Sequence, residues 1–396
     1  MKKISFSRTA LISASALLAG IILLCSCSQI TKNTGRNTSG GEKQDGAETA
    51  AVTTTEVTTS AATTATDDTQ PYVDGDNTQI YIPDSTPYKK ITLDGVKDHH
   101  FIADDFCYIE SEKCFIFLDK DIDLPGDFVV NVEAIITEIE NQLGISSCPD
   151  SYNYCPLSDN SSYYGGINPW KGWHTGNKIP IFLMVDRKSE GLISCAFSDE
   201  TIFVIYELFS EDFWNSVPDY KNNPWRRMDA VDYGTIAHEL THTITGRNCD
   251  LTDILTEGIA EYTSRTVIDA LADNYPSIGE YNAQRYLYDF GVPESVNADN
   301  AERIFIEDYN QLTHAERGAQ YDYGRCLFNY LNNEYGADYF SRLNSYINGN
   351  GLHYSYGNYD EALVTDYATA LKELFGDDIF TKFGDWCVKN NQLQYY

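Results

Sequence analysis

Residues 28–79 cannot contribute to a hydrophobic core, which confines any fold to the remainder of the chain. Tyr72 is the one aromatic residue in this segment, and threonine predominates between residues 49 and 69. Such a composition cannot bury enough apolar surface to offset the conformational entropy lost on folding. We therefore predict a disordered tether over residues 27–79, which as a flexible coil spans on the order of 40 Å. The folded part begins near residue 80.

The segment before the tether has the order of an export signal. Basic residues precede an apolar run from Ala10 to Leu24, and this run is shorter than the roughly 20 residues of a membrane-spanning helix. The small residue Ser26 stands directly before Cys27, a pattern that resembles the lipobox of bacterial lipoproteins. The resemblance implies a signal peptide over residues 1–26 and a lipid anchor on Cys27, at the outer face of the cytoplasmic membrane. An ordinary cleaved signal is the alternative, and it also exports the chain.

The chain is strongly acidic, with a formal net charge of -31 at pH 7. This charge argues against nucleic acids and anionic membrane surfaces as partners, because both repel an acidic protein. We therefore expect no nucleic-acid partner and membrane contact through the N-terminal lipid anchor only.

Cysteine spacing leaves the disulfide pattern open. An exported chain with an even number of cysteines after Cys27 permits disulfides, but spacing does not determine which cysteines pair. Cys148 and Cys155 flank a turn-rich stretch, and Cys107 and Cys114 flank a tight turn. Buried free thiols are the alternative for all of them.

Strand patterns come first in the folded part, and helical patterns follow. The runs Phe106–Ile109 and Phe115–Leu118 predict a hairpin, and Lys178–Val185 and Thr201–Leu208 predict further strands. Strands that precede helices predict an α+β fold.

Helical periodicity begins in the stretch Val129–Leu143, which stops at Gly144. A second helix is predicted over Met228–Thr245, with its end at Gly246, and nearly all of the chain after Leu255 has helical periodicity.

The second predicted helix contains the sequence HELTH from His238 to His242. Four residues advance an α-helix by about 400°, so the two imidazoles project from nearly the same face. They can bind one metal ion, and the carboxylate of Glu239 lies beside that face, within reach of a water molecule on the ion. The pattern predicts that His238 and His242 bind Zn²⁺ and that Glu239 is the general base.

A catalytic zinc requires a third protein ligand and one open position for water. The sequence LTEGIAEY follows His242 closely, from Leu255 to Tyr262. It resembles the second helix of gluzincins, the zinc metallopeptidases that include thermolysin and aminopeptidase N. The resemblance implies that Glu257 is the third ligand and that Glu261, one turn later, hydrogen-bonds a ligand histidine. A solvated helix charge is the alternative for Glu261.

The sequence YDYG, from Tyr321 to Gly324, opens a helical pattern over Arg325–Tyr335. Aminopeptidase N relatives carry a similar Tyr-x-x-Gly, whose tyrosine donates a hydrogen bond to the tetrahedral oxyanion. The resemblance implies this role for Tyr321, with Tyr323 as the alternate position. Core packing of these tyrosines is the competing interpretation.

The same resemblance implies a zincin-like α+β domain. It would consist of a mixed β region with the active-site helices at residues 80–262 and a mostly helical part at residues 263–396. Glu200–Leu208 would be the edge strand that pairs with an extended substrate. The exopeptidase signature of the aminopeptidase N branch is missing, because Gly191–Cys195 has neither its Met nor its Glu, which favours an endopeptidase.

These features predict zinc-dependent hydrolysis of peptide bonds in extracellular peptides or proteins, with glycoproteins as an open possibility. The alternative is a non-catalytic surface binding protein that uses a peptidase-like cleft, with the aromatic segment Tyr346–Tyr359 as its recognition surface. Glu239 favours the enzyme, since a binding protein has no chemical need for a general base. A purely structural zinc is disfavoured because such sites are closed by four Cys or His ligands.

Overall fold

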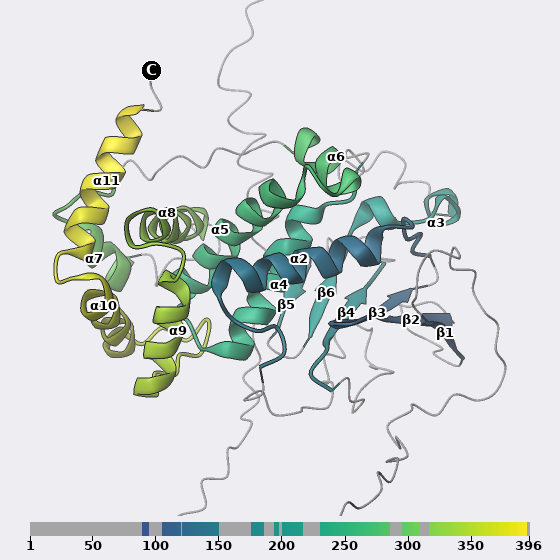
Figure 1. Ribbon diagram of the computed structural model, residues 1–396, viewed down its shortest axis with the longest axis horizontal. Helices are drawn as coiled ribbons and strands as arrows, with labels where there is room; N and C mark the ends of the chain where they lie inside the picture. Colours follow the sequence, from purple (N-terminus) through teal and green to yellow (C-terminus); the bar gives the residue numbers. More distant parts are fainter. Residues whose placement is uncertain are drawn as a thin grey trace, which may run out of the picture. The chain divides into compact units, whose positions relative to one another are not determined.

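The computed structural model describes residues 89–94, 105–119, 121–149, 176–185, 194–197, 200–216, 230–285, 295–308 and 317–393 (Figure 1). The expected signal peptide, the lipid anchor on Cys27 and the tether lie outside these ranges. Within them the protein has a mixed α/β architecture that is mostly helical, with one small mixed sheet. No helix of the described residues is long and apolar enough to cross a membrane.

The described strands form a six-stranded sheet in the order β1-β2-β3-β4-β6-β5. The strands are β1 (Lys89–Asp94), β2 (Asp105–Glu110), β3 (Cys114–Asp119), β4 (Ile179–Leu183), β5 (Cys195–Ala196) and β6 (Thr201–Phe203). Strands β1, β2 and β3 are antiparallel, β3, β4 and β6 are parallel, and β5 is antiparallel to β6. The predicted hairpin is confirmed as β2 and β3.

The interior of the sheet is apolar. Ile116 of β3 and Ile181 of β4 have no accessible surface, and the stacked rings of Phe117 and Phe182 have centroids 4.7 Å apart. Continuous apolar strands of this kind are typical of strands that are covered on both faces.

Helices make up most of the rest of the described chain. They are α2 (Phe128–Leu143), η2 (Tyr206–Leu208), α3 (Glu211–Ser216), α4 (Tyr233–Asn248), α5 (Asp253–Leu271), α6 (Pro276–Gln284), α7 (Ala301–Arg303), η4 (Ile304–Asp308), α8 (Arg317–Tyr335), α9 (Tyr339–Asn350), α10 (Glu361–Phe375) and α11 (Ile379–Leu393). Helix α2 ends as predicted, at Gly144 in the left-handed conformation, which glycine adopts without a Cβ penalty.

Helix α4 differs from its predicted bounds at both ends. It begins after Asp232, whose side chain accepts a hydrogen bond from the backbone N–H of Thr235 at 2.9 Å, a typical N-cap. It continues through Gly246 to Asn248. Arg247 explains the extension, because its guanidinium donates to the carbonyl of Asn177 at 2.7 Å and so fixes the last turn against the strand region.

Two other predicted boundaries are also wrong. Strand β6 ends at Phe203, and the 3-10 helix η2 replaces the end of the predicted strand Thr201–Leu208. Tyr321 lies inside α8 and not before it, because α8 already begins at Arg317.

Helix α4 packs against β5 and β6 and also against α5, which in turn packs against α8 (Figure 1). The α5–α8 contact depends on two facing glycines. A Cβ atom added to Gly258 would lie 2.4 Å from the backbone of Gly324, and one added to Gly324 would lie 2.4 Å from the carbonyl oxygen of Ile254. Only glycine permits so close an approach of two backbones. The glycine of the YDYG sequence therefore brings α8 against α5, the helix that carries the LTEGIAEY sequence.

The cysteines whose side chains the structure describes are free thiols. In the β2–β3 hairpin Cys107 lies opposite Leu118, so the register does not place Cys107 opposite Cys114. Cys155 lies outside the described residues, which leaves its pairing with Cys148 a prediction. The free cysteines of the described part are Cys114, Cys148, Cys195, Cys249, Cys326 and Cys387.

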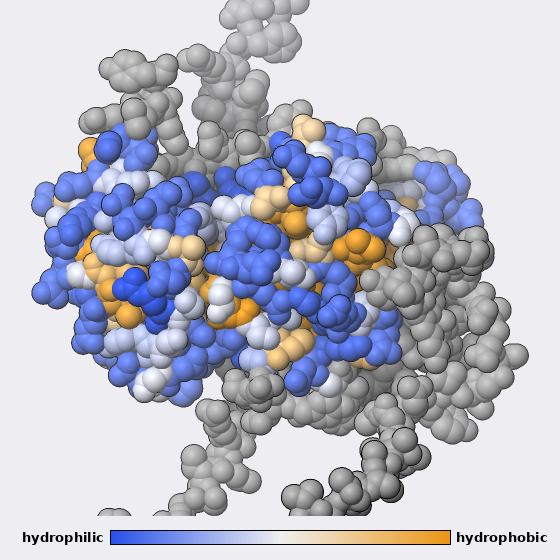
Figure 2. Space-filling view, viewed as in Figure 1, coloured by the Kyte–Doolittle hydropathy of each residue, from blue (hydrophilic) through white to orange (hydrophobic). Residues whose placement is uncertain are grey.

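The surface of the described part is mainly hydrophilic. In Figure 2 apolar residues form small scattered patches between hydrophilic ones on the face in view. Among the described residues, Val130 and Val388 are the large apolar side chains that are exposed. Apolar side chains are thus concentrated in the core, as expected for a folded acidic domain.

Candidate metal centre

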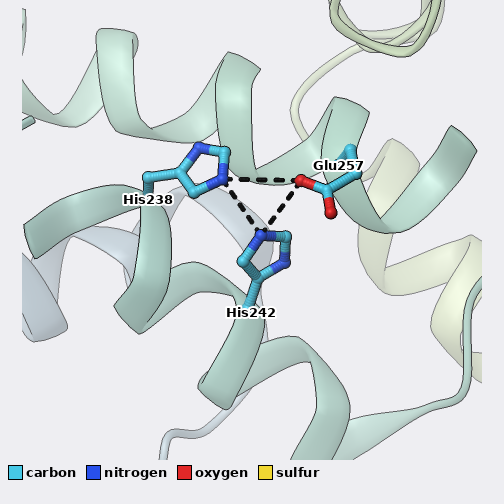
Figure 3. Close-up of side chains that lie close together, drawn as sticks. All are labelled: His238, His242 and Glu257. Atoms are coloured by element: carbon cyan, nitrogen blue, oxygen red, sulfur yellow. Dashed lines mark hydrogen bonds and ion pairs between the residues drawn. The ribbon is translucent and has the colours of Figure 1, made fainter. Parts of the chain in front are cut away.

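His238 and His242 of α4 face Glu257 of α5 (Figure 3). The Nε2 atoms of the two histidines are 3.0 Å apart. Oε2 of Glu257 lies 3.6 Å from Nε2 of His238 and 3.3 Å from Nε2 of His242. The structure thus brings together the three residues that the sequence predicts as ligands.

Buried side chains direct the two imidazoles toward α5. Ile236, Leu240 and Ile244 have no accessible surface and follow one another at four-residue spacing, which places them in one stripe against the core. The histidines lie two positions further along, about 200° around the helix. The packed stripe therefore turns His238 and His242 away from the sheet core and toward Glu257.

The spacing of the three atoms fits a tetrahedral ion. Zinc–ligand distances of about 2.0–2.1 Å give separations of roughly 3.3 Å between neighbouring tetrahedral ligands, close to the separations in this cluster. Oε2 of Glu257 is buried, and apart from its approach to the two imidazoles it makes no hydrogen bond with a described group. Burial of a carboxylate oxygen that has no other hydrogen-bond donor costs free energy of folding unless a nearby cation compensates its charge. The two nitrogen donors and one oxygen donor suit zinc.

The charged side chains of the cluster shift one another's pKa values. Burial alone would lower the pKa of His238, but hydrogen bonds to Glu257 and Glu261 hold that pKa well above its usual value. Burial likewise would raise the pKa of Glu257, whereas the charges of His242 and His238 hold it well below its usual value. Both shifts favour an ion pair between the imidazole and the carboxylate, and a metal ion bound here would compete with a proton for Nε2 of His238.

Glu261 contacts the other side of the His238 ring. Its Oε2 lies 3.3 Å from Nδ1 of His238, and its Oε1 accepts a hydrogen bond from Arg265 at 2.8 Å. Burial would raise the pKa of Glu261, but His238 and Arg265 outweigh burial and lower it to about 2. A charged carboxylate at Nδ1 keeps the proton on that nitrogen and leaves Nε2 facing the centre. This is the contact expected for Glu261.

Glu239 follows His238 on α4 and is partly buried. Burial raises its pKa, and the charges of His238 and His242 offset this effect only in part. A carboxyl group with a raised pKa is a stronger base than a solvated one, so this environment suits a residue that accepts a proton.

The structure distinguishes the two candidate tyrosines of α8. The ring of Tyr321 stacks on the ring of His238, with centroids 6.1 Å apart and an interplanar angle of 18°. The ring of Tyr323 is fully buried, and its hydroxyl donates to the carbonyl of Ala301 at 2.7 Å. Tyr321 therefore borders the centre, and Tyr323 is a packing residue.

The prediction that Glu200–Leu208 forms the edge strand is wrong. Strand β6, which begins at Thr201, pairs with β4 on one side and β5 on the other, so among the described strands it is internal. The outer position belongs to β5. A two-residue strand has no sequence periodicity of its own, which is why the longer β-rich run is mistaken for the edge.

A pocket of about 190 Å³ adjoins the centre. Ala196 and Phe197, at the end of β5, line it together with His242, Glu257 and Tyr356. The pocket thus connects the outer strand of the sheet with the candidate ligands.

Tyr356 is a site residue that sequence reasoning misses. Its hydroxyl donates a hydrogen bond to Oε1 of Glu257, from 99 positions further along the chain. The interpretation of Tyr346–Tyr359 as a recognition surface does not account for this inward contact, and no local spacing signals it. The Glu261–Arg265 pair, by contrast, has the i,i+4 spacing that predicts a helix ion pair.

No protein-family model, no curated protein and no solved structure matches this chain.

Proposed function

We propose that this protein is a zinc metallopeptidase of the gluzincin type that cleaves peptide bonds in extracellular peptides or proteins. The convergence of His238, His242 and Glu257 carries the proposal, together with the buried Oε2 of Glu257 that lies between the two imidazoles. Three protein ligands leave one coordination position open, which a catalytic zinc requires and a structural zinc does not have.

Three features of the fold support a zincin-like domain. Helix α4 carries the HELTH sequence and packs on the sheet, and α5 carries Glu257 at its side. The antiparallel strand β5 borders the pocket that His242 lines, where an extended substrate could add its own backbone to the sheet.

Each residue around the centre has a separate role in the proposed hydrolysis. Zinc, when bound by these residues, would polarise the substrate carbonyl and lower the pKa of a water ligand to about 7. Glu239, whose pKa burial raises, accepts the proton of the attacking water and passes it to the leaving amine. Tyr321, beside His238, donates a hydrogen bond to the oxyanion. Glu261 holds His238 in the tautomer that presents Nε2.

The proposed location and substrate class follow from sequence features. The expected signal peptide and lipid anchor on Cys27 would place the enzyme at the outer face of the cytoplasmic membrane, and the acidic charge argues against nucleic acid as a partner. The missing exopeptidase signature favours internal cleavage, with protein, peptide and glycoprotein substrates all compatible.

The experiment compares Glu239→Gln with the wild type and with Glu112→Gln, a control at an exposed position in the β2–β3 turn. All three full-length proteins receive zinc, and both metal content and cleavage of a peptide and glycoprotein library are measured. We expect equal zinc content in all three and loss of at least about 100-fold in cleavage rate for Glu239→Gln alone.

Two other outcomes would contradict the enzyme. A wild type that takes up no zinc lacks the metal centre. A wild type that binds zinc but cleaves nothing, and binds one partner as tightly as Glu239→Gln does, would be the non-catalytic binding protein.

A further inference from the structure

The loop between α9 and α10 reaches back to the candidate metal centre. We call residues 352–359 the tyrosine loop. Its Tyr354 is buried against Tyr367 of α10, with ring centroids 6.3 Å apart. Its far end is held by Tyr359, whose hydroxyl donates to the carbonyl of Ile306 at 2.8 Å.

The middle of the tyrosine loop is attached to the first turns of α5. The backbone N–H of Gly357 donates to Oδ1 of Asp253 at 2.8 Å, and the neighbouring Tyr356 donates its hydroxyl hydrogen to Oε1 of Glu257. The loop is thus fixed at three places, and Tyr356 lies at the one nearest to the two imidazoles. A side chain held on both flanks can position its partner with little loss of entropy.

The two oxygens of Glu257 have different environments. Oε2 approaches both imidazoles and makes no other hydrogen bond within the described part of the chain, whereas Oε1 accepts the hydrogen bond from Tyr356. A carboxylate that coordinates a metal through both oxygens occupies two positions, and one that coordinates through a single oxygen leaves a position free. Occupation of Oε1 by a hydroxyl donor disfavours the two-oxygen mode.

We propose that Tyr356 is a positioning residue that commits Glu257 to one-oxygen coordination and so keeps coordination positions open for water and substrate. The inference rests on the proposed function, because it takes Glu257 as a metal ligand. It adds a residue from a different part of the chain to the centre. Since Tyr356 also lines the adjoining pocket, the same loop couples the shape of that pocket to the geometry of the ligand.

The test removes one hydroxyl group at a time. Tyr356→Phe deletes the donor to Glu257. Tyr346→Phe is the matched control, because Tyr346 donates to Glu373 at 2.7 Å on the exposed surface of α9 and α10. Tyr359→Phe weakens the far attachment of the tyrosine loop and leaves the donor to Glu257 in place.

The measurements are zinc affinity, by competition with a chromophoric chelator, and the visible absorption of Co²⁺ bound to the full-length proteins. We expect Tyr356→Phe to lose about 10- to 100-fold in zinc affinity, the usual effect of removing a hydrogen bond to a metal ligand. We also expect weaker Co²⁺ absorption, because d–d bands weaken as the coordination number rises. Tyr346→Phe and Tyr359→Phe should keep the wild-type affinity and spectrum.

The results separate this inference from the proposed function. If the wild type binds zinc and Tyr356→Phe matches it in affinity and spectrum, the role of Tyr356 is refuted and the metal centre stands. If Tyr359→Phe reproduces the loss, folding of the loop and not the hydroxyl of Tyr356 is responsible, and the inference is again refuted. If the wild type binds neither metal, both proposals fail.

Discussion

Glu261 lies 3.3 Å from Nδ1 of His238, while Nε2 of the same ring faces Glu257. One imidazole therefore contacts two carboxylates through its two nitrogens, and only Glu257 belongs to the candidate ligand set. Since Arg265 holds Glu261 in place, residues of α5 contribute to the orientation of a ring that α4 carries.

This relationship predicts the effect of Glu261→Gln. The amide keeps the size of the side chain but loses the charge that retains the proton on Nδ1, so we expect zinc affinity to fall about 10- to 100-fold. Chelator competition on the variant measures the loss, with Glu112→Gln as the exposed control. Unchanged affinity would mean that Glu261 is only a helix charge paired with Arg265.

A second prediction concerns the contact between α5 and α8. A Cβ on Gly324 would meet the carbonyl oxygen of Ile254 at 2.4 Å and Cα of Gly258 at 2.6 Å, and both are backbone atoms. We expect Gly324→Ala to lower the free energy of unfolding by about 1–3 kcal/mol or more, as overpacking does. Thermal denaturation measures the effect.

Gly349 provides the matched control for this prediction. It lies in α9, and an added Cβ would meet nothing within 4 Å. Gly349→Ala should therefore raise stability, by about 0.5–1 kcal/mol, because alanine favours the helix. Equal melting temperatures for the two variants would refute the close packing of α5 on α8.

Local sequence patterns predict the parts of the site that depend on helix geometry. The four-residue spacing of His238 and His242 is a property of a single helix, so it can be recognised without tertiary information. The hairpin and the end of α2 at Gly144 are predicted for the same reason. The roles of Glu257 and Glu261 are expected only from the resemblance of LTEGIAEY to gluzincins.

The remaining features depend on tertiary contacts. Gly246 does not end α4, because Arg247 is fixed by the carbonyl of Asn177, 70 positions away in the chain. Tyr356 reaches Glu257 across 99 positions, and the outer strand β5 is too short to have a pattern. Such contacts leave no signature in a sequence window, which is why the tyrosine loop and the strand order are found only in the structure.

A third prediction tests location. The resemblance to a lipobox implies that a fatty-acid analogue supplied in growth medium labels the full-length protein at Cys27, and that Cys27→Ala abolishes the label. Gel fluorescence after metabolic labelling provides the measurement. A label that persists in Cys27→Ala would assign the anchor to another residue, and an unlabelled wild type would indicate an ordinary cleaved signal.

A fourth prediction concerns Tyr321, whose ring stacks on His238. An oxyanion donor acts mainly in the transition state, so Tyr321→Phe should reduce kcat more than it changes KM and leave zinc content intact. Tyr346→Phe, on the exposed surface, is the control for loss of a hydroxyl group. A change in KM alone would instead place Tyr321 in substrate binding.

The last prediction uses Glu207 of η2, which lies near the N-terminus of α4. Burial, and then the charge of Asp232, raise the pKa of Glu207 from 4.5 to about 8. The oxygens of Asp232 accept hydrogen bonds from N and Oγ1 of Thr235 at 2.9 and 2.8 Å, which holds this carboxylate at the N-cap of α4.

The sign of the pH dependence follows from this raised pKa. Between pH 4.5 and about 8 the folded protein holds a proton on Glu207 that the unfolded chain has lost, so the free energy of unfolding decreases as pH rises through this range. Glu207→Gln removes the ionisable group and with it this decrease. At pH 8 we expect the variant to exceed the wild type by on the order of a few kcal/mol, and at pH 4 we expect the difference to vanish. Urea denaturation at both pH values measures this difference in the free energy of unfolding, with Glu112→Gln as the exposed control. A difference that does not depend on pH would refute the raised pKa of Glu207.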